Sequence, residues 1–115
     1  MVTRKAWGFE KQLVNTELYC CKVLTVTGGK ICSLHRHLVK DETFVCLEGS
    51  GYIEVEGHLA RVQPFSELRI PPGTWHRFGS RDGMRLLEVS THHDDEDVER
   101  KTVSGDLPEA IARLE

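Results

Sequence analysis

Turn residues interrupt this sequence at short intervals, and this feature limits its fold more than any other. The interruptions fall at Gly28–Gly29, Gly49–Gly51, Gly57, Pro64, Pro71–Gly73 and Gly79–Gly83. Between them lie segments of roughly five to ten residues that are rich in Val, Ile, Thr, Leu, Phe and Cys, a composition typical of strands. Such a chain has room for many short strands and for little helix.

The segments between the turns predict eight strands. These strands are Leu18–Thr27, Ile31–His37, Thr43–Glu48, Gly51–Glu56, Leu59–Val62, Glu67–Ile70, Trp75–Phe78 and Arg85–Ser90. Alternation within Tyr52–Glu56 predicts that Ile53 and Val55 face the interior, while Tyr52, Glu54 and Glu56 face water. So many strands in so short a chain predict an all-β fold that is closed or double-layered.

Composition excludes several classes of protein. The 115 residues carry a net charge of −3 and are 39% hydrophobic, which is typical of one globular domain and not of a disordered tail. The absence of a basic stripe argues against nucleic acid as a partner. We find no run of about 20 apolar residues and no apolar segment after Met1, so we expect no membrane contact and a cytoplasmic protein. The four cysteines lie inside apolar segments without CxxC pairs, and we expect reduced thiols.

The last part of the chain, residues 92–115, differs from the strand-rich core at about 18–90. His92–Arg100 is a dense run of charges, which we interpret as solvated surface, with a second metal site as the alternative. Asp106 and Pro108 predict the start of one short helix over Glu109–Leu114. We expect this tail to lie outside the barrel or to mediate contacts, within one domain that spans residues 1–115.

Four side chains from separate segments have the spacing of metal ligands. His35 and His37 are two residues apart, so both imidazoles project from one face of an extended strand. If the chain turns at Lys40–Asp41, Glu42 begins the next strand beside them, and the rigid turn Pro71–Gly73 delivers His76. Three imidazoles and a carboxylate suit a divalent transition metal, and the absence of thiolates argues against a closed structural zinc site.

The same residues match the motifs of a known family, the cupins. The first cupin motif, G-x5-H-x-H-x3/4-E-x6-G, is matched at every spacing by Gly29, His35, His37, Glu42 and Gly49. The second, G-x5-P-x-G-x2-H-x3-N, is matched by Pro71, Gly73 and His76, but Phe65 replaces its glycine and Ser80 its asparagine. This resemblance implies a jelly-roll barrel, also called a double-stranded β-helix, with a metal ion inside. The ion would be Mn²⁺, Zn²⁺, Fe²⁺, Co²⁺ or Ni²⁺.

Two further residues resemble those of the sugar isomerases among the cupins. The order His-x-His-x-x-Lys-x-Glu, which includes Lys40, looks like that of the D-lyxose isomerases, and type II phosphomannose isomerases carry Arg at the corresponding place. Glu88 lies in an otherwise apolar strand, in a Glu-x-Ser-Thr stretch like that of the lyxose isomerases. A carboxylate on such a strand is costly unless it is paired or used.

The resemblance therefore implies an aldose–ketose isomerase that acts through an enediolate on a sugar or sugar phosphate. Glu88 would be the general base and acid, and Lys40 would donate to the developing oxyanion. An iron-dependent dioxygenase and a non-catalytic sugar- or metal-binding module are the alternatives, because the cupin barrel hosts many functions. We expect a homodimer, with Trp7–Phe9 or the Asp94–Arg100 tail reaching across.

Overall fold

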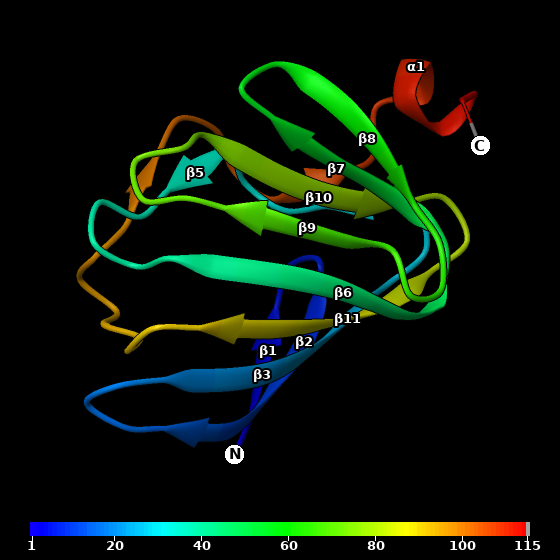
Figure 1. The fold of residues 1–115 in the computed structure, drawn as a ribbon. Helices are drawn as coiled ribbons and strands as arrows, with labels where there is room; N and C mark the ends of the chain where they lie inside the picture. Colours follow the sequence, from blue (N-terminus) through cyan, green and yellow to red (C-terminus); the bar gives the residue numbers. More distant parts are fainter. Residues whose placement is uncertain (115) are drawn as a thin grey trace.

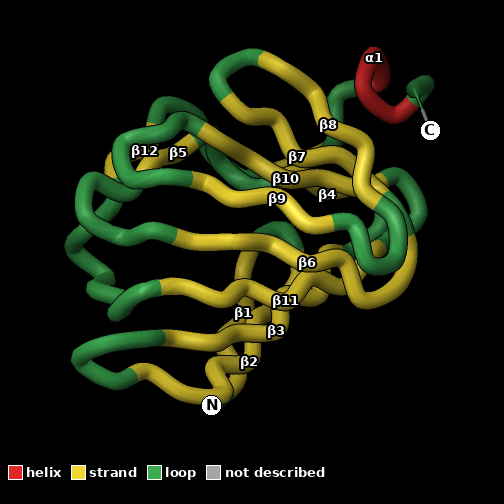
Figure 2. The backbone as a smooth tube through the Cα atoms, viewed as in Figure 1, coloured by secondary structure: helices red, strands yellow, loops and turns green. Residues whose placement is uncertain are grey.

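The computed structural model describes residues 1–114, which form two antiparallel β-sheets packed face to face (Figures 1 and 2). The first sheet has the order β1-β2-β3-β11-β6-β9. Its strands are β1 (Val2–Lys5), β2 (Gly8–Asn15), β3 (Cys20–Val26), β6 (Glu42–Gly49), β9 (Glu67–Ile70) and β11 (Met84–Ser90). The predicted double-layered all-β architecture is confirmed.

The second sheet is centred on β10, which pairs with β7 and also with the two short strands β4 and β5. Its strands are β4 (Lys30–Ile31), β5 (His35–Arg36), β7 (Gly51–Val55), β8 (His58–Val62), β10 (His76–Ser80), β12 (Glu99–Arg100) and β13 (Gly105–Asp106). None of the helices among residues 1–114 is long and apolar enough to cross a membrane.

The core fills the space between the two sheets. Strands β3 and β11 alternate strictly between buried and more exposed residues, so Leu24 and Leu86 face the interior and are almost fully buried. Trp7 packs edge-on against Phe78 at a centroid distance of 5.0 Å, and Phe44 lies beside Phe78 at 5.8 Å. The four cysteines are free thiols, as predicted.

The hairpin β1–β2 was not predicted, and its composition explains why. The residues of β2 that pair with the inward-facing positions of β3 include Glu10 and Gln12, opposite Leu24 and Lys22. Polar residues on the inner face remove the alternation that marks a half-buried strand. The barrel therefore begins at Val2 instead of at residue 18.

The predicted strand Ile31–His37 is interrupted, because the tail takes over its hydrogen bonds. Between β4 and β5, the amide of Ser33 donates to Ser104 Oγ and the amide of Leu34 to Thr102 Oγ1. Strands β12 and β13 pair with β5 and β4 on either side of this gap. The tail is therefore part of the second sheet, which corrects the expectation that it lies outside the barrel.

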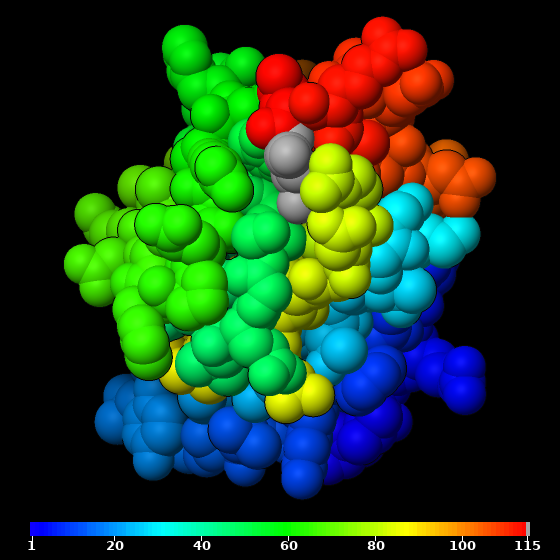
Figure 3. All heavy atoms as spheres, turned by 90° about the vertical axis from the view of Figure 1, so that its right-hand side faces the viewer, coloured from blue at the N-terminus to red at the C-terminus, as the bar shows by residue number. Residues whose placement is uncertain are grey.

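The terminal helix α1 (Glu109–Ala112) is shorter than predicted and begins after Pro108 without a side-chain cap. Asp106 is not the cap, because its carboxylate pairs with Lys30 Nζ at 2.7 Å. Figure 3 shows the C-terminal segment, in red, beside the green β7–β8 region, and Ile111 packs there against Tyr52. Tyr52 is consequently buried, contrary to the prediction that it faces water, and its hydroxyl donates to the carbonyl of Leu114.

Of the two departures from the second cupin motif, Phe65 lies in a turn and Ser80 is the last residue of β10. Phe65 adopts a positive φ of 70°, a conformation that favours glycine, while its side chain is 82% exposed. Ser80 Oγ donates to the carbonyl of Ser50 at 2.6 Å and accepts from the amide of Gly83 at 2.9 Å. The serine thus joins the end of β10 to the segments at Ser50 and Gly83, whereas Phe65 stores strain.

We expect Phe65→Gly to raise the free energy of unfolding by about 1 kcal/mol, because it relieves the left-handed strain and removes little packing. Phe65→Ala is the matched control, since it also removes the ring but keeps the Cβ. Urea unfolding of both variants measures the difference. Equal stabilities of the two variants would contradict the assignment of strain to Phe65.

Candidate metal centre

Three histidines converge at one end of the barrel. His35 lies on β5, His37 follows that strand, and His76 opens β10 after the turn at Pro71–Gly73. His35 and His76 are backbone partners across the two strands, and their ring centroids are 4.3 Å apart. One ligand nitrogen from each of the three rings lies within 4.8 Å of the others. The sequence spacing therefore brings together the three imidazoles that it predicted.

Backbone carbonyls fix the tautomer of each ring. The Nδ1 atoms of His35, His37 and His76 donate to the carbonyls of Ser33, Asp97 and Thr74 at 2.7, 2.7 and 2.8 Å. Because a carbonyl oxygen only accepts, each Nδ1 carries the hydrogen, and each Nε2 keeps a free lone pair. Ligand histidines in metal sites are oriented in this way.

Glu42 supplies an oxygen beside these nitrogens. It opens β6, is 2% exposed, and its Oε1 lies 2.9 Å from His76 Nε2, while its Oε2 lies 3.6 Å from His37 Nε2. Neither oxygen of Glu42 nor Nε2 of His76 has a partner in hydrogen-bonding geometry. Buried polar atoms without partners are costly, and a divalent transition metal among them would satisfy all of them at once. The donor set therefore fits such an ion.

Burial and neighbouring charges keep the donor set ready for a cation. Burial lowers the pKa of His35 to about 3, with a further contribution from His76, and lowers that of His37 to about 4, with help from Lys40. Burial alone would raise the pKa of Glu42, but His76 and Lys40 outweigh it and hold this pKa at about 2. At neutral pH, His35 and His37 are therefore neutral and Glu42 is ionised.

Lys40 joins the centre to a second carboxylate. Its side chain is buried, and its Nζ lies 3.1 Å from Glu42 Oε2, 3.1 Å from Glu88 Oε2 and 3.2 Å from His93 Nδ1. Nζ donates hydrogen bonds to Glu88 and His93, whereas Glu42 is an ion-pair partner outside hydrogen-bonding geometry. Burial lowers the pKa of Lys40, but Glu88 and Glu42 outweigh it and raise the pKa overall.

Glu88 projects into the barrel from β11, together with Leu86 and Ser90, as the alternation of that strand requires. Burial, reinforced by the negative charge of Glu42, raises the pKa of Glu88. The two carboxylates that share Lys40 thus have pKa values moved in opposite directions. Two neighbouring carboxylates whose pKa values are moved in opposite directions are typical of sites that transfer protons.

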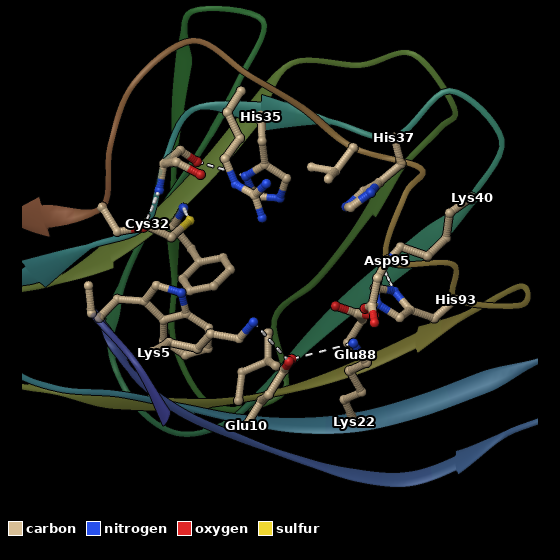
Figure 4. A pocket seen from close by; sticks show the side chains of 18 of the residues that line it. Lys5, Glu10, Lys22, Cys32, His35, His37, Lys40, Glu88, His93 and Asp95 are labelled. Carbon is tan, nitrogen blue, oxygen red and sulfur yellow. Dashed lines mark hydrogen bonds and ion pairs between the residues drawn. The ribbon is translucent and has the colours of Figure 1, made fainter. Parts of the chain in front are cut away.

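A cavity of about 170 Å³ lies between the histidines and the opposite wall of the barrel (Figure 4). It is small compared with the roughly 300–1,000 Å³ of pockets for drug-sized ligands, so it suits a small metabolite. The residues with polar side chains that line it include Lys5, Glu10, Lys22, Ser33, His35, His37, Lys40, Glu88, His93, Asp94, Asp95, Arg100 and Ser104.

Glu10, Lys22 and His93 are among the lining residues that were not predicted as site residues. The alternation of Cys20, Lys22, Leu24 and Val26 would have placed Lys22 on the inner face of its strand. Nothing in the sequence marks Glu10, because the polar hairpin that carries it was not recognised.

The acidic run after β11 is more than solvated surface. The Asp97 carboxylate accepts from the amides of Leu38, Val39 and Lys40 at 2.8 to 3.2 Å, while its backbone carbonyl holds His37. His93 faces the cavity and donates from Nε2 to Asp95 at 2.8 Å. Among residues 1–114, only His35, His37 and His76 form a cluster suited to a metal, so the alternative of a second site in this run has no support.

Comparison with known proteins identifies relatives of this chain. The family model for the cupin domain matches residues 22–90. The D-lyxose/D-mannose isomerase of Thermosediminibacter oceani is 32% identical over 111 residues, which cover 72% of this chain and 61% of that protein. The mannose-1-phosphate guanylyltransferase of Sinorhizobium fredii is 27% identical over 89 residues, covering 76% of this chain and 17% of that protein.

A solved structure shows the same fold. KdgF from Halomonas sp. superposes with a TM-score of 0.71 at 18% identity, covering 76% of this chain and 81% of that one. The chain spans about three-fifths of the length of the lyxose/mannose isomerase and less than a fifth of the guanylyltransferase.

Adding Mn²⁺ or Zn²⁺ to protein stripped with a chelator should raise the melting temperature, because an ion that binds only the folded state stabilises it by mass action. His37→Gln should reduce both this shift and the metal content measured by mass spectrometry. His58→Gln is the control, because His58 is exposed on β8. Metal binding by the His37→Gln variant at the wild-type level would contradict the site.

The metal-free protein should lose stability as the pH falls from 7 to 4. In that range the unfolded chain takes up protons near the ordinary histidine pKa of 6.5, while His35 and His37 in the folded chain bind them only near 3 and 4. The double variant His35→Asn with His37→Asn should show a shallower fall in melting temperature. If the melting temperature of the double variant falls with pH as steeply as that of the wild type and of His58→Asn, His35 and His37 do not cause the loss of stability.

Proposed function

Because the chain belongs to the cupin domain family, we propose that it is a metal-dependent aldose–ketose isomerase that acts on a sugar or a sugar phosphate. The observation that carries this proposal is the pair of buried carboxylates, Glu42 and Glu88, held 3.1 Å from the same Lys40 ammonium beside three histidines. One carboxylate faces the ligand nitrogens, and the other faces the cavity.

The metal would be held by His35, His37, Glu42 and His76. When bound, a divalent ion supplies a Lewis acid that polarises the sugar carbonyl and makes the neighbouring C–H more acidic. The protein prepares its own side of this site, because the three backbone carbonyls hold the imidazoles in the required tautomer before any ligand arrives.

Glu88 would move the proton. As a carboxylate it removes the hydrogen from C2 of the open-chain aldose, which leaves an enediolate, and as a carboxylic acid it returns that hydrogen to C1 while the proton on O2 passes to O1. A base that must also act as an acid works best with a pKa near the operating pH, and burial moves the pKa of Glu88 in that direction.

Lys40 acts first on Glu88 and only then on the substrate. Its ammonium donates to Glu88 Oε2 and to His93 Nδ1, and it forms an ion pair with Glu42. To donate to a developing oxyanion, as the sequence suggested, Lys40 must release one of these partners. His93 is the one it can release without exposing a buried charge, because burial and the charge of Lys40 lower the pKa of His93.

The walls of the cavity would protect the reaction from water. Trp7, Leu24 and Phe78 form an apolar side, and residues 93–95 of the tail close the side next to Lys40. The similarity to a lyxose/mannose isomerase supports a sugar as substrate. We also propose that residues 1–115 form one domain and that the protein is a homodimer.

Glu88→Gln should reduce the formation of ketose by at least about 100-fold, because the amide cannot take up the proton. Metal content and melting temperature should stay at the wild-type level. The assay is NMR in D₂O with a panel of free and phosphorylated pentoses and hexoses, which detects ketose and deuterium at C1 or C2. Glu48→Gln is the matched control, since Glu48 is exposed on β6 and pairs with Arg85.

The alternatives give different results in the same assay. Isomerisation without oxygen excludes the iron-dependent dioxygenase, whose turnover would require it. Binding of metal and sugar without ketose or deuterium would identify a non-catalytic module. Turnover by the Glu88→Gln variant at the wild-type rate would overturn the assignment of Glu88.

A further inference from the structure

Lys22 is a buried cation that the proposed chemistry does not use. It lies on β3, and only 5% of its side chain is exposed. Its one ion-pair partner among residues 1–114 is Glu10, whose Oε2 lies 3.4 Å from Nζ, and this contact is long for a hydrogen bond. Because an ammonium carries three donors, Lys22 has donors to spare, and its side chain lines the cavity.

Glu10 lies beside Lys22 and has a second cation of its own. Its Oε1 is 3.4 Å from Lys5 Nζ, and its side chain is 16% exposed. Figure 4 shows Glu10 and Lys22 on the wall of the cavity opposite His35 and His37. A ligand held at the histidines would fill the cavity toward this pair.

The position of Lys22 also relates it to Glu88. The two residues are directly paired between β3 and β11, and both side chains face the interior. Cross-strand neighbours on one face have Cβ atoms about 4.5–5.5 Å apart. A carbon atom within reach of Glu88 thus has its neighbouring substituents near Lys22.

The chemistry of the pair selects its ligand. A lysine only donates and a carboxylate only accepts, whereas a hydroxyl does both. Two adjacent hydroxyls can therefore donate to Glu10 and accept from Lys22 together. A phosphate dianion cannot donate to Glu10, because it carries no hydrogen, and the carboxylate of Glu10 repels it.

We propose that Glu10 and Lys22 form a subsite for neighbouring hydroxyls of an unphosphorylated sugar. This inference rests on the proposed function, and it decides between a free sugar and a sugar phosphate as the substrate. Lys22 is here a specificity residue, which holds the part of the sugar that does not react. Arg100, at the exposed rim of the cavity, is the cation at which a phosphate would bind instead.

The test uses ligands that cannot react. Mannitol and mannitol 1-phosphate are titrated into the Zn²⁺-loaded protein and followed by NMR of the backbone amides. Mannitol should bind more tightly than mannitol 1-phosphate. Lys22→Met should weaken the binding of mannitol by about 10- to 100-fold, the loss expected for hydrogen bonds to a charged group. Lys22→Arg should restore part of the affinity, which a purely structural role would not predict.

Two further variants guard against a folding defect. Glu10→Gln keeps the shape of the wall and should also weaken mannitol binding, while Lys11→Met, on the same hairpin but exposed, should not change it. Unchanged binding of mannitol to folded Lys22→Met and Glu10→Gln would overturn the subsite. Tighter binding of mannitol 1-phosphate that is lost in Arg100→Met would overturn it as well.

The two proposals can fail separately. If mannitol binding depends on Lys22 but no sugar is isomerised, the subsite stands and the isomerase proposal is rejected. If the protein isomerises a sugar but its binding of mannitol does not depend on Lys22 and Glu10, the isomerase proposal stands and the subsite is rejected.

Discussion

The burial of the Glu42 carboxylate is the constraint on which the rest of this structure depends. The residue is 2% exposed and ionised, and none of its oxygen atoms has a hydrogen bond. An isolated charge in such a position is strongly destabilising, so cations must surround it. Lys40 supplies one from the protein, and the three clustered imidazoles, two of them beside Glu42, prepare a place for a metal ion.

Several features of the fold follow from the need to hold these groups. The tail beyond β11 supplies the carbonyl that orients His37 and the carboxylate that caps the loop before Lys40. It also interrupts the strand that carries His35 by supplying hydroxyl acceptors to two of its amides. The segment that looked like solvated surface in the sequence is therefore a structural part of the centre.

The sequence predicted the centre better than it predicted its surroundings. The spacing of His35 and His37 predicted that their imidazoles lie on one side, and the turn at Pro71–Gly73 with the cupin motif predicted that His76 joins them. Turn residues and β-rich segments marked the other strands between Cys20 and Ser90, although β4 and β5 were predicted as one strand. The hairpin β1–β2 was missed because its inner face is polar, and with it Glu10 was lost, although it lines the cavity. Tyr52 was misplaced because the helix that covers it comes from a distant part of the chain.

The positions of charges also change the roles of residues. In the sequence, Lys40 is a free cation suited to an oxyanion, but in the structure its three partners make it first the holder of Glu88. Lys22, which the sequence did not single out, has the unused donors. Whether a lysine has unused donors depends on which carboxylates lie within about 4 Å of its ammonium, and only the packed structure determines which ones do.

X-ray absorption spectroscopy of the Zn²⁺-loaded protein tests the central claim most directly. The account predicts a shell of light atoms near 2.0–2.1 Å with the outer-shell scattering of three imidazoles, and no sulfur at 2.3 Å. A spectrum with one imidazole or none, or with a thiolate from one of the cysteines, would contradict it.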